Sequence, residues 1–276
     1  MIKLSQGDFE RLSSYVYQQC GINLTPPKRV LLEGRLQKRL QSLQMKSFME
    51  YYKHVKSVAG RGELVHMLDS VSTNKTDFFR EPGHFNLLRD HILPGFKGMN
   101  VNRPLRIWSA ACSTGEEPYT TAMVLQDAVE KLGSINYEIL ATDISSKVLK
   151  HAANAVYRED RIGDIPMGFR KKYLLKSKDP NQGLVRIIPA LRKKVRFQRM
   201  NLMDNEYLSQ IKIPQDLVFC RNVLIYFDKP TQQNVVRRLV ECLSPGGYLF
   251  IGHSESLFEM DLPLKQLMPA TFQKLA

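Results

Sequence analysis

The chain has 276 residues, 43% of them hydrophobic, and a formal net charge of +13 at pH 7. This length allows one large domain or a small domain followed by a medium one, and the apolar content excludes a chain that is disordered throughout. No apolar run approaches the length of a bilayer span, and residues 1–6 are too polar to begin a signal peptide, so we expect a soluble, cytoplasmic protein. The positive charge attracts polyanions, namely nucleic acid, anionic membrane or an acidic protein surface, without selecting among them.

Residues 5–69 have the apolar periodicity of several short helices. Ser5 is suited to cap the first of them, and Phe9, Leu12 and Val16 then recur at helical spacing. A second helix begins after the two prolines at 26 and 27, and a set of leucines forms its apolar face. A different face of this helix is basic and carries Lys28, Arg35, Lys38, Arg39 and Lys46. We predict a small all-helical domain over residues 1–72.

Residues 73–81 (TNKTDFFRE) do not have the pattern of an ordinary core element. They combine polar side chains with two adjacent aromatics and an arginine, and they precede a strand-like run at 105–111 that leads into small residues and a helix. A polar segment beside a strand–turn–helix unit predicts a ligand site built from two chain segments. Phe78 and Phe79 either pack the domain junction, or one of them covers the pocket.

From residue 105 onward, strand-like runs alternate with helical windows. We predict strands at 105–111, 137–143, 195–200, 217–222 and 247–252, and helices at 117–131, 146–154 and 230–242. This alternation indicates an α/β fold with a mostly parallel sheet and helices on both faces. Residues 264–274 have the pattern of an antiparallel hairpin at the sheet edge. Residues from about 165 to 194 break the alternation and predict a small, strongly basic β insertion.

Ligands of open α/β sheets bind beyond the carboxyl ends of the strands. The first strand ends in ACSTG (111–115), where small residues let the backbone approach a ligand and the helix start offers free N–H groups; a plain turn is the alternative. The second strand ends in Asp143, which suits a ribose hydroxyl or, alternatively, caps the next helix, a role that Ser145 can also fill. Together these two strand ends favour an adenosine ligand.

The remaining polar strand ends are less specific. The fourth strand runs into Arg221 and Asn222 and then into Tyr226, which suggests the rim of a site, with a satisfied strand end as the alternative. His253 follows the fifth strand, where a structural role is favoured over a catalytic one. The Asn/Asp-Pro-Pro-aromatic run of enzymes that methylate base amines is absent here.

The cysteines are predicted to be structural. Cys20, Cys112, Cys220 and Cys242 are scattered, without a C-x-x-C pair or zinc-ligand spacing. Three of them lie in or beside apolar runs, where a reduced cysteine packs as a small hydrophobe. We therefore predict no metal site, and a nucleophilic Cys112 is the alternative.

Four motifs together resemble one family. They are TNKTDFFR (73–80), SAACSTGEEPY (109–119), ATDI (141–144) and CRNVLIYF (220–227). The chain resembles the bacterial chemotaxis receptor methyltransferases, the CheR family, which are S-adenosylmethionine-dependent protein-glutamate O-methyltransferases. The likeness extends over essentially the whole chain, including the N-terminal helices and the basic insertion.

The resemblance implies a Rossmann-like methyltransferase domain over residues 73–276, with seven strands of which the last is antiparallel. It also implies that S-adenosylmethionine is the cofactor and S-adenosylhomocysteine the product. The residues that would hold the cofactor are Asn74, Thr76, Arg80, Glu117, Asp143, Asn201, Leu202, Arg221 and Asn222. Among them, Glu117 and Asp143 would hold the amino acid and ribose ends, with Glu116 as an alternative to Glu117. Arg80 and Tyr226 would lie nearest the transferred methyl group and act in catalysis.

The implied substrate is a set of glutamates on the cytoplasmic helices of chemoreceptors, so the enzyme would be recruited to membrane-bound receptor arrays without entering the membrane. Arg35, Lys38 and Arg39 would dock the acidic receptor helix, and in some members the insertion binds a receptor's C-terminal pentapeptide. We expect a monomer that does not bind nucleic acid. A nucleic-acid methyltransferase and a non-catalytic receptor adaptor are the alternatives.

Overall fold

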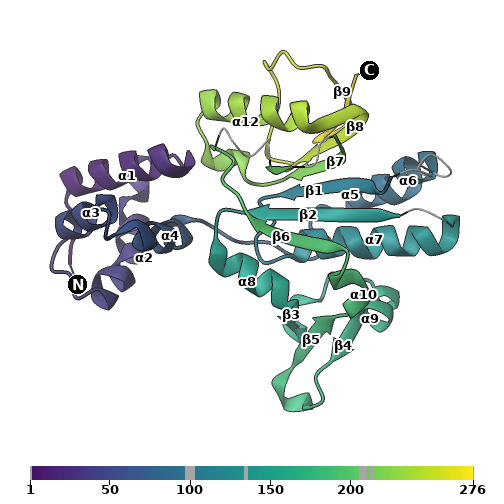
Figure 1. Ribbon diagram of the computed structural model, residues 1–276, viewed down its shortest axis with the longest axis horizontal. Helices are drawn as coiled ribbons and strands as arrows, with labels where there is room; N and C mark the ends of the chain where they lie inside the picture. The colour runs from purple at the N-terminus through teal and green to yellow at the C-terminus, as the bar shows by residue number, and fades with distance from the viewer. Residues whose placement is uncertain (1, 97–102, 134–135, 205–209, 212–213, 276) are drawn as a thin grey trace.

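The structure, a computed structural model, describes residues 2–96, 103–133, 136–204, 210–211 and 214–275. It consists of a helical N-terminal part and a larger α/β part built on a seven-stranded sheet (Figure 1). The chain passes from one part to the other after α4 (Arg61–Val71), which is close to the boundary that the sequence predicts.

The N-terminal part is all-helical, as predicted. It contains α1 (Gln6–Cys20), η1 (Pro26–Lys28), α2 (Arg29–Ser42), α3 (Phe48–Lys56) and α4. The side chains of Ser5 and Ser47 cap α1 and α3, because each hydroxyl accepts a hydrogen bond from the backbone amide three residues on. α1 ends at Gly21, whose φ of 72° is a conformation that favours glycine. Leu12 and Val16 are fully buried in the core between the helices.

A partly buried ion pair joins three of these helices. The guanidinium of Arg39 on α2 donates to both carboxylate oxygens of Glu63 on α4, at 2.8 and 2.6 Å, and the Tyr51 hydroxyl on α3 donates to the same carboxylate at 2.9 Å. Burial disfavours the charged form of Glu63, but the hydrogen bonds from Arg39 and Tyr51 outweigh it and hold the pKa of Glu63 below its ordinary value. The charge of Arg39 is therefore engaged inside the domain.

The main sheet confirms the predicted methyltransferase-type arrangement. Its spatial order is β6 (Val195–Arg199), β2 (Tyr137–Asp143), β1 (Leu105–Ala110), β7 (Gln215–Cys220), β8 (Leu243–Ile251), β10 (Thr271–Lys274) and β9 (Leu264–Met268). The first five strands in this order are parallel, and β10 is antiparallel to both of its neighbours. The hairpin predicted for residues 264–274 is formed by β9 and β10.

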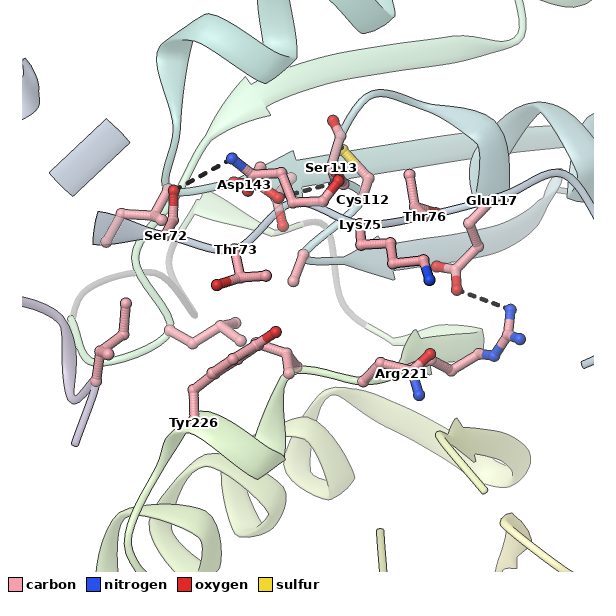
Figure 2. Close-up of a pocket in the computed structure, with 18 of the residues that line it drawn as sticks. Ser72, Thr73, Lys75, Thr76, Cys112, Ser113, Glu117, Asp143, Arg221 and Tyr226 are labelled. Atoms are coloured by element: carbon pink, nitrogen blue, oxygen red, sulfur yellow. Dashed lines mark hydrogen bonds and ion pairs between the residues drawn. The ribbon is translucent and has the colours of Figure 1, made fainter. Parts of the chain in front are cut away.

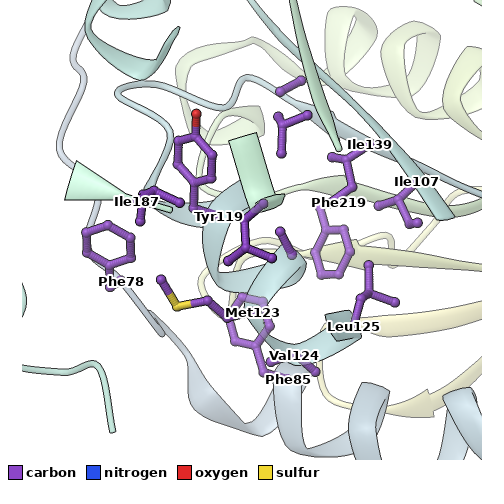
Figure 3. Packing of buried hydrophobic residues seen from close by; sticks show 14 of the residues in the cluster. Phe78, Phe85, Ile107, Tyr119, Met123, Val124, Leu125, Ile139, Ile187 and Phe219 are labelled. Carbon is purple, nitrogen blue, oxygen red and sulfur yellow. The ribbon is translucent and has the colours of Figure 1, made fainter. Parts of the chain in front are cut away.

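Successive side chains of each buried strand point to opposite faces of the sheet, so both faces are apolar and both are covered by helices. The covering helices are α7 (Glu116–Leu132), α8 (Ser146–Asn154), α12 (Lys229–Cys242), and the consecutive α5 (Pro82–Leu87), η2 (Leu88–Ile92) and α6 (Leu93–Gly95). Ile107 of β1 packs in one cluster with Met123 of α7 and Phe85 of α5, which Figure 3 shows. The next residue, Trp108, belongs to the cluster on the other face, with Val236 of α12.

The β insertion begins earlier than the predicted residue 165. Its antiparallel sheet has the order β3 (Val156–Arg158), β5 (Leu184–Ile187) and β4 (Leu174–Lys176), and its helical turns are η3 (Glu159–Arg161), α9 (Met167–Tyr173), η4 (Pro180–Gln182) and α10 (Pro189–Arg192). β3 follows α8 directly and is only three residues long, which is too short for a strand periodicity to be recognised in the sequence. Among the described residues, no helix is long and apolar enough to cross a membrane.

The ion pair in the helical domain leads to a prediction about stability. Glu63→Gln should lower the free energy of unfolding by roughly 1–3 kcal/mol at neutral pH, because Arg39 and Tyr51 lose a charged acceptor. Since the pKa of Glu63 is lower in the folded protein, the stabilisation is present above the ordinary value of 4.5 and is lost as the pH falls through the folded value.

Urea unfolding at about pH 7 and at about pH 4 would measure this difference, which should shrink at the lower pH. Glu10→Gln on the exposed face of α1 is the matched control, and we expect it to change little at either pH. A difference of equal size at both pH values would contradict the assignment.

Candidate functional site

A pocket lies at the carboxyl ends of β1, β2 and β7, as expected for an open α/β sheet. It encloses about 980 Å³, part of it open to solvent, and residues 72–77 form one of its walls. Figure 2 shows Thr73 and Lys75 of this wall opposite Tyr226 and Arg221. The pocket brings together the cofactor residues predicted from the sequence: Asn74, Thr76, Arg80, Glu117, Asp143, Asn201, Leu202, Arg221 and Asn222 all line it.

The turn after β1 passes close to its neighbours. Ala111 and Ser113 have positive φ values of 67° and 50°, and the following Gly115 has a φ of 96°. A Cβ atom on Gly115 would lie 2.8 Å from the Cβ of Ala152 and 3.0 Å from the Tyr157 hydroxyl, so only glycine fits where α7 begins. The small residues of this turn therefore serve close packing as well as the pocket.

Asp143 orders the turn from the end of β2. Its two carboxylate oxygens accept hydrogen bonds of 2.9 Å from the backbone amides of Ser113 and Ser145. Ser145 itself caps α8, because its hydroxyl accepts from the Val148 amide, so the capping alternative for Asp143 is wrong. Burial raises the pKa of Asp143, against the opposing effect of these backbone hydrogen bonds.

The two adjacent glutamates at the start of α7 point in different directions. Glu117 lines the pocket, accepts from the Ser109 hydroxyl at 2.7 Å and forms an ion pair of 3.0 Å with Arg221. Glu116 does not line this pocket and accepts from the Thr114 hydroxyl at 2.6 Å. Burial raises the pKa of both carboxyls. The geometry therefore selects Glu117 as the acid of the pocket.

Arg221 is buried and its charge is paired twice. Besides Glu117, its guanidinium contacts the carboxylate of Glu81 at 3.1 Å, donates to the backbone carbonyl of Arg80, and lies 5.4 Å from the centroid of the Phe85 ring. Burial opposes ionisation of Glu81, but the charge of Arg221 together with the hydrogen bonds from His253, Asn222 and Arg221 outweighs it and holds the pKa of Glu81 below its ordinary value. The position of Glu81 beside the 73–80 motif was the only sequence signal for this partner.

Asn222 sits beside this pair in a left-handed conformation, with a φ of 57°. Its backbone amide donates to Glu255 at 3.0 Å and its side-chain amide to Glu81 at 3.3 Å. Sequence reasoning did not assign a role to Glu255, which holds the loop after β8 against the loop after β7.

Glu81, His84 and His253 are near enough to one another to resemble a metal site, with their ligand atoms within 4.8 Å. Both oxygens of Glu81 are already engaged, however, by Arg221, Asn222 and the backbone amide of His253. Burial, reinforced by the charge of Arg221, lowers the pKa of His84 to about 4, so this imidazole is neutral at pH 7. The cluster is better explained as packing around Arg221 than as a cation site.

The segment before α5 separates pocket residues from core residues. Asn74 and Thr76 are half-buried in the pocket wall, and Arg80 donates to the Lys75 carbonyl at 3.1 Å. Phe78 is fully buried in the main core, and the centroid of its ring lies 4.9 Å from that of the Tyr157 ring. Phe79 packs against the same core, and neither phenylalanine lines the pocket.

The helical domain completes the pocket, which sequence reasoning missed. Cys20 and Ile22, at the end of α1 and just after it, line it directly. The side-chain amide of Asn201 donates to the Gln19 carbonyl at 2.7 Å, and the amide of Asn23 donates to the Tyr226 carbonyl at 2.8 Å. No local sequence signal predicts these contacts, because they join residues far apart in the chain.

The three residues predicted to dock a receptor differ in their surroundings. Lys38 is exposed, whereas Arg39 is paired with Glu63. Arg35 donates to the Thr73 hydroxyl at 2.8 Å and to the Val71 carbonyl.

Two family models match this chain, one over the helical N-terminal part and one over the α/β part. Residues 7–72 match the family model described as CheR methyltransferase, all-alpha domain, and residues 74–272 match CheR methyltransferase, SAM binding domain. The chain belongs to the CheR methyltransferase family. It is therefore a methyltransferase that uses S-adenosylmethionine.

Three curated relatives are named chemotaxis protein methyltransferases. The protein of Borreliella burgdorferi is 41% identical over 99% of this chain and 96% of its own length. The second protein of this name in Pseudomonas aeruginosa is 41% identical over 90% and 86%, and that of Escherichia coli is 38% identical over 94% and 88%.

The pocket fits this cofactor. Two carboxyls, the mostly buried one of Glu117 and the buried one of Asp143, suit a ligand that carries an ammonium group and ribose hydroxyls. Apolar walls from Ile22 and Leu202 suit an adenine ring. All four cysteines are free and buried, which was predicted from apolar surroundings for Cys112, Cys220 and Cys242. Cys20 and Cys112 lie in the pocket wall.

The surroundings of Cys112 lead to a prediction about catalysis. Burial, reinforced by the charge of Asp143, raises the pKa of the Cys112 thiol well above its ordinary value, so the thiol is neutral and a poor nucleophile at pH 7. Cys112→Ala should therefore keep methyl transfer within about threefold of the wild type. The measurement is transfer from labelled S-adenosylmethionine, with Cys242→Ala as a control for loss of a buried thiol elsewhere. Abolished transfer with cofactor binding intact would instead identify Cys112 as a nucleophile.

Proposed function

We propose that the protein transfers the methyl group of S-adenosylmethionine to glutamate side chains of chemotaxis receptors, giving glutamate methyl esters and S-adenosylhomocysteine. The observation that carries this proposal is the 38–41% identity to chemotaxis protein methyltransferases over 90% or more of the chain. The pocket wall from Asn74 onward lies inside the range matched by the cofactor-binding family model.

The proposed reaction needs no general base. A glutamate side chain has a pKa near 4.3 and is already ionised at neutral pH. The cofactor supplies an electrophilic methyl group on a sulfonium sulfur. The protein must then place the carboxylate in line with that group, and positioning of this kind lowers a barrier by up to roughly 7–11 kcal/mol. None of the described residues that line the pocket is a histidine, which is compatible with such a mechanism.

We assign the cofactor residues by their chemistry. Glu117 would hold the amino group and Asp143 the ribose, while Asn201 and Leu202 would bracket the adenine. The rest of the set would complete the pocket: Asn74, Thr76, Arg80, Arg221 and Asn222. In this proposal, the ion pair of Arg221 with Glu117 keeps the carboxylate directed at the pocket before the cofactor binds.

Arg80 and Tyr226 would orient the substrate carboxylate. Both side chains are half-buried and line the pocket. A guanidinium and a phenol hydroxyl donate hydrogen bonds to a carboxylate without accepting a proton from it, which suits a nucleophile that is already charged.

The proposed partner is the acidic, helical cytoplasmic domain of a chemoreceptor. The enzyme would bind it as a monomer at membrane-associated receptor arrays. Lys38 is exposed on α2 and can contact such a helix directly. Arg35 is held by uncharged acceptors within the protein, so we propose that it adds positive potential to the docking face, whereas Glu63 offsets the charge of Arg39, which would contribute less.

The reaction type can be tested with labelled S-adenosylmethionine and receptor-containing membranes. The wild type should incorporate label that base treatment releases, because methyl esters are base-labile and methylamines are not. Arg80→Ala should lower kcat by about 100-fold through loss of positioning, and Tyr226→Phe should lower it less. Near-normal turnover of Arg80→Ala would contradict its role. Label in RNA would contradict the substrate assignment, and cofactor binding without any transfer would contradict enzymatic activity.

The assignment of Glu117 can be tested by the pH dependence of cofactor-product binding. Burial raises the pKa of Glu117 in the free protein, so its charge is lost at a higher pH than that of a free glutamate. The affinity for the cationic amino group of S-adenosylhomocysteine should therefore fall as the pH drops through this value.

Isothermal titration calorimetry across the acidic range would measure this dependence. Glu117→Gln should weaken binding and flatten the pH profile. The adjacent Glu116→Gln is the matched control and should keep both the affinity and the profile, since Glu116 does not line the pocket. If Glu116→Gln had the larger effect, the assignment would be reversed.

A further inference from the structure

Within the pocket wall of residues 72–77, the stretch from Thr73 to Asp77 is held at both ends by arginines from other parts of the fold. At its start, Arg35 of α2 donates to the Thr73 hydroxyl at 2.8 Å and to the Val71 carbonyl. At its end, Arg161 of η3 donates to the Thr76 carbonyl at 2.8 Å and forms an ion pair of 2.9 Å with Asp77. One arginine belongs to the helical domain and the other to the β insertion.

Between these two points, the wall contacts the main sheet. The Ser113 hydroxyl, in the turn after β1, donates to the carbonyl of Asn74 at 2.9 Å. The side chains that this stretch offers to the pocket include Asn74 and Thr76, two of the cofactor residues. The carbonyls of Asn74 and Thr76 accept hydrogen bonds from Ser113 and Arg161, so these bonds position the backbone that carries both side chains.

Because Arg161 and Asp77 are partly exposed, their contacts should affect ligand binding more than they affect the stability of the fold. The side chains of Arg161 and Asp77 are 47% and 35% exposed, and such ion pairs contribute little to global stability. The hydrogen bond that Arg161 donates to the Thr76 carbonyl nevertheless restricts the backbone next to the ligand. A loss of this contact should therefore change ligand affinity more than the stability of the free protein.

We propose that Arg35 and Arg161 are positioning residues, which clamp the segment from Thr73 to Asp77 over the cofactor pocket from the helical domain and from the β insertion. The clamp acts on cofactor binding and needs no receptor, so it stands apart from the substrate assignment. It also gives Arg35 a role that differs from receptor docking.

The test is calorimetric binding of S-adenosylhomocysteine to the full chain, together with the melting temperature without ligand. Arg161→Ala and Arg35→Ala should each weaken binding about three- to tenfold, the effect expected for about one net hydrogen bond. The ligand-free melting temperature of Arg161→Ala should change by no more than about 2 °C. In turnover assays, the KM for S-adenosylmethionine should rise while kcat at saturation stays close to the wild type.

Matched controls come from the same two parts of the fold. Arg158→Ala removes an exposed arginine of the insertion that pairs with Asp160, and Arg29→Ala removes an exposed arginine at the start of α2; neither should change the affinity. Arg161→Lys should recover part of the binding, because a lysine can still reach the carbonyl as a single donor.

Two further variants separate positioning from folding. Thr73→Val removes one of the two acceptors of Arg35, the one in the pocket wall, and leaves the Val71 carbonyl in place; it should weaken binding without lowering the melting temperature. Asp77→Asn should cost less affinity than Arg161→Ala, since the bond to the Thr76 carbonyl remains. Binding by Arg161→Ala and Thr73→Val within twofold of the wild type would overturn the proposal, as would a loss of affinity that only tracks the melting temperature.

Discussion

The buried charge of Arg221 is the constraint on which the arrangement of the pocket depends. A buried ion costs several kcal/mol to desolvate, and removing one partner of a buried pair typically costs about 3–5 kcal/mol. Arg221 meets this requirement with Glu81 and Glu117 as ion-pair partners and the Arg80 carbonyl as an acceptor. These groups come from the residues just before α5 and from the start of α7, while Arg221 follows β7. Complete pairing of one guanidinium therefore sets the relative positions of three separate chain segments.

The carboxyls in the pocket also have hydrogen-bond or ion-pair partners, although the protein as a whole carries a net charge of +13. The carboxyls of Glu117 and Asp143 are held by donors that leave them directed inward. The excess of positive charge lies instead on the surface, as at Lys38 of α2. A cationic cofactor and an acidic protein partner can then bind to different regions of the protein without competing for the same charges. The hydrogen bonds of Asn201 and Asn23 join the helical domain to the α/β domain beside the pocket.

Local patterns in the sequence were sufficient for most of the fold and for much of the pocket. The strand 137–143 and the helix 146–154 were predicted with the bounds that the structure has, because a short apolar run defines the strand and the Ser145 cap defines the helix start. Strand ends in a parallel sheet meet at one edge, so the sequence alone assigns Asp143, Arg221 and the turn after β1 to one site.

Other features were decided only in the tertiary structure. The side chain of Glu117 lines the pocket and that of its neighbour Glu116 does not. Phe78 is buried in the core, although it lies within the 73–80 motif. Arg39 has the periodicity of a surface cation, yet Glu63 pairs with it inside the domain. Sequence by itself determined which elements form and which strand ends carry polar groups, because periodicity, caps and turn residues act over a few positions. Which side chains meet depends on contacts between distant segments, as for Cys20 in the pocket wall, and only packing of the whole chain settles those.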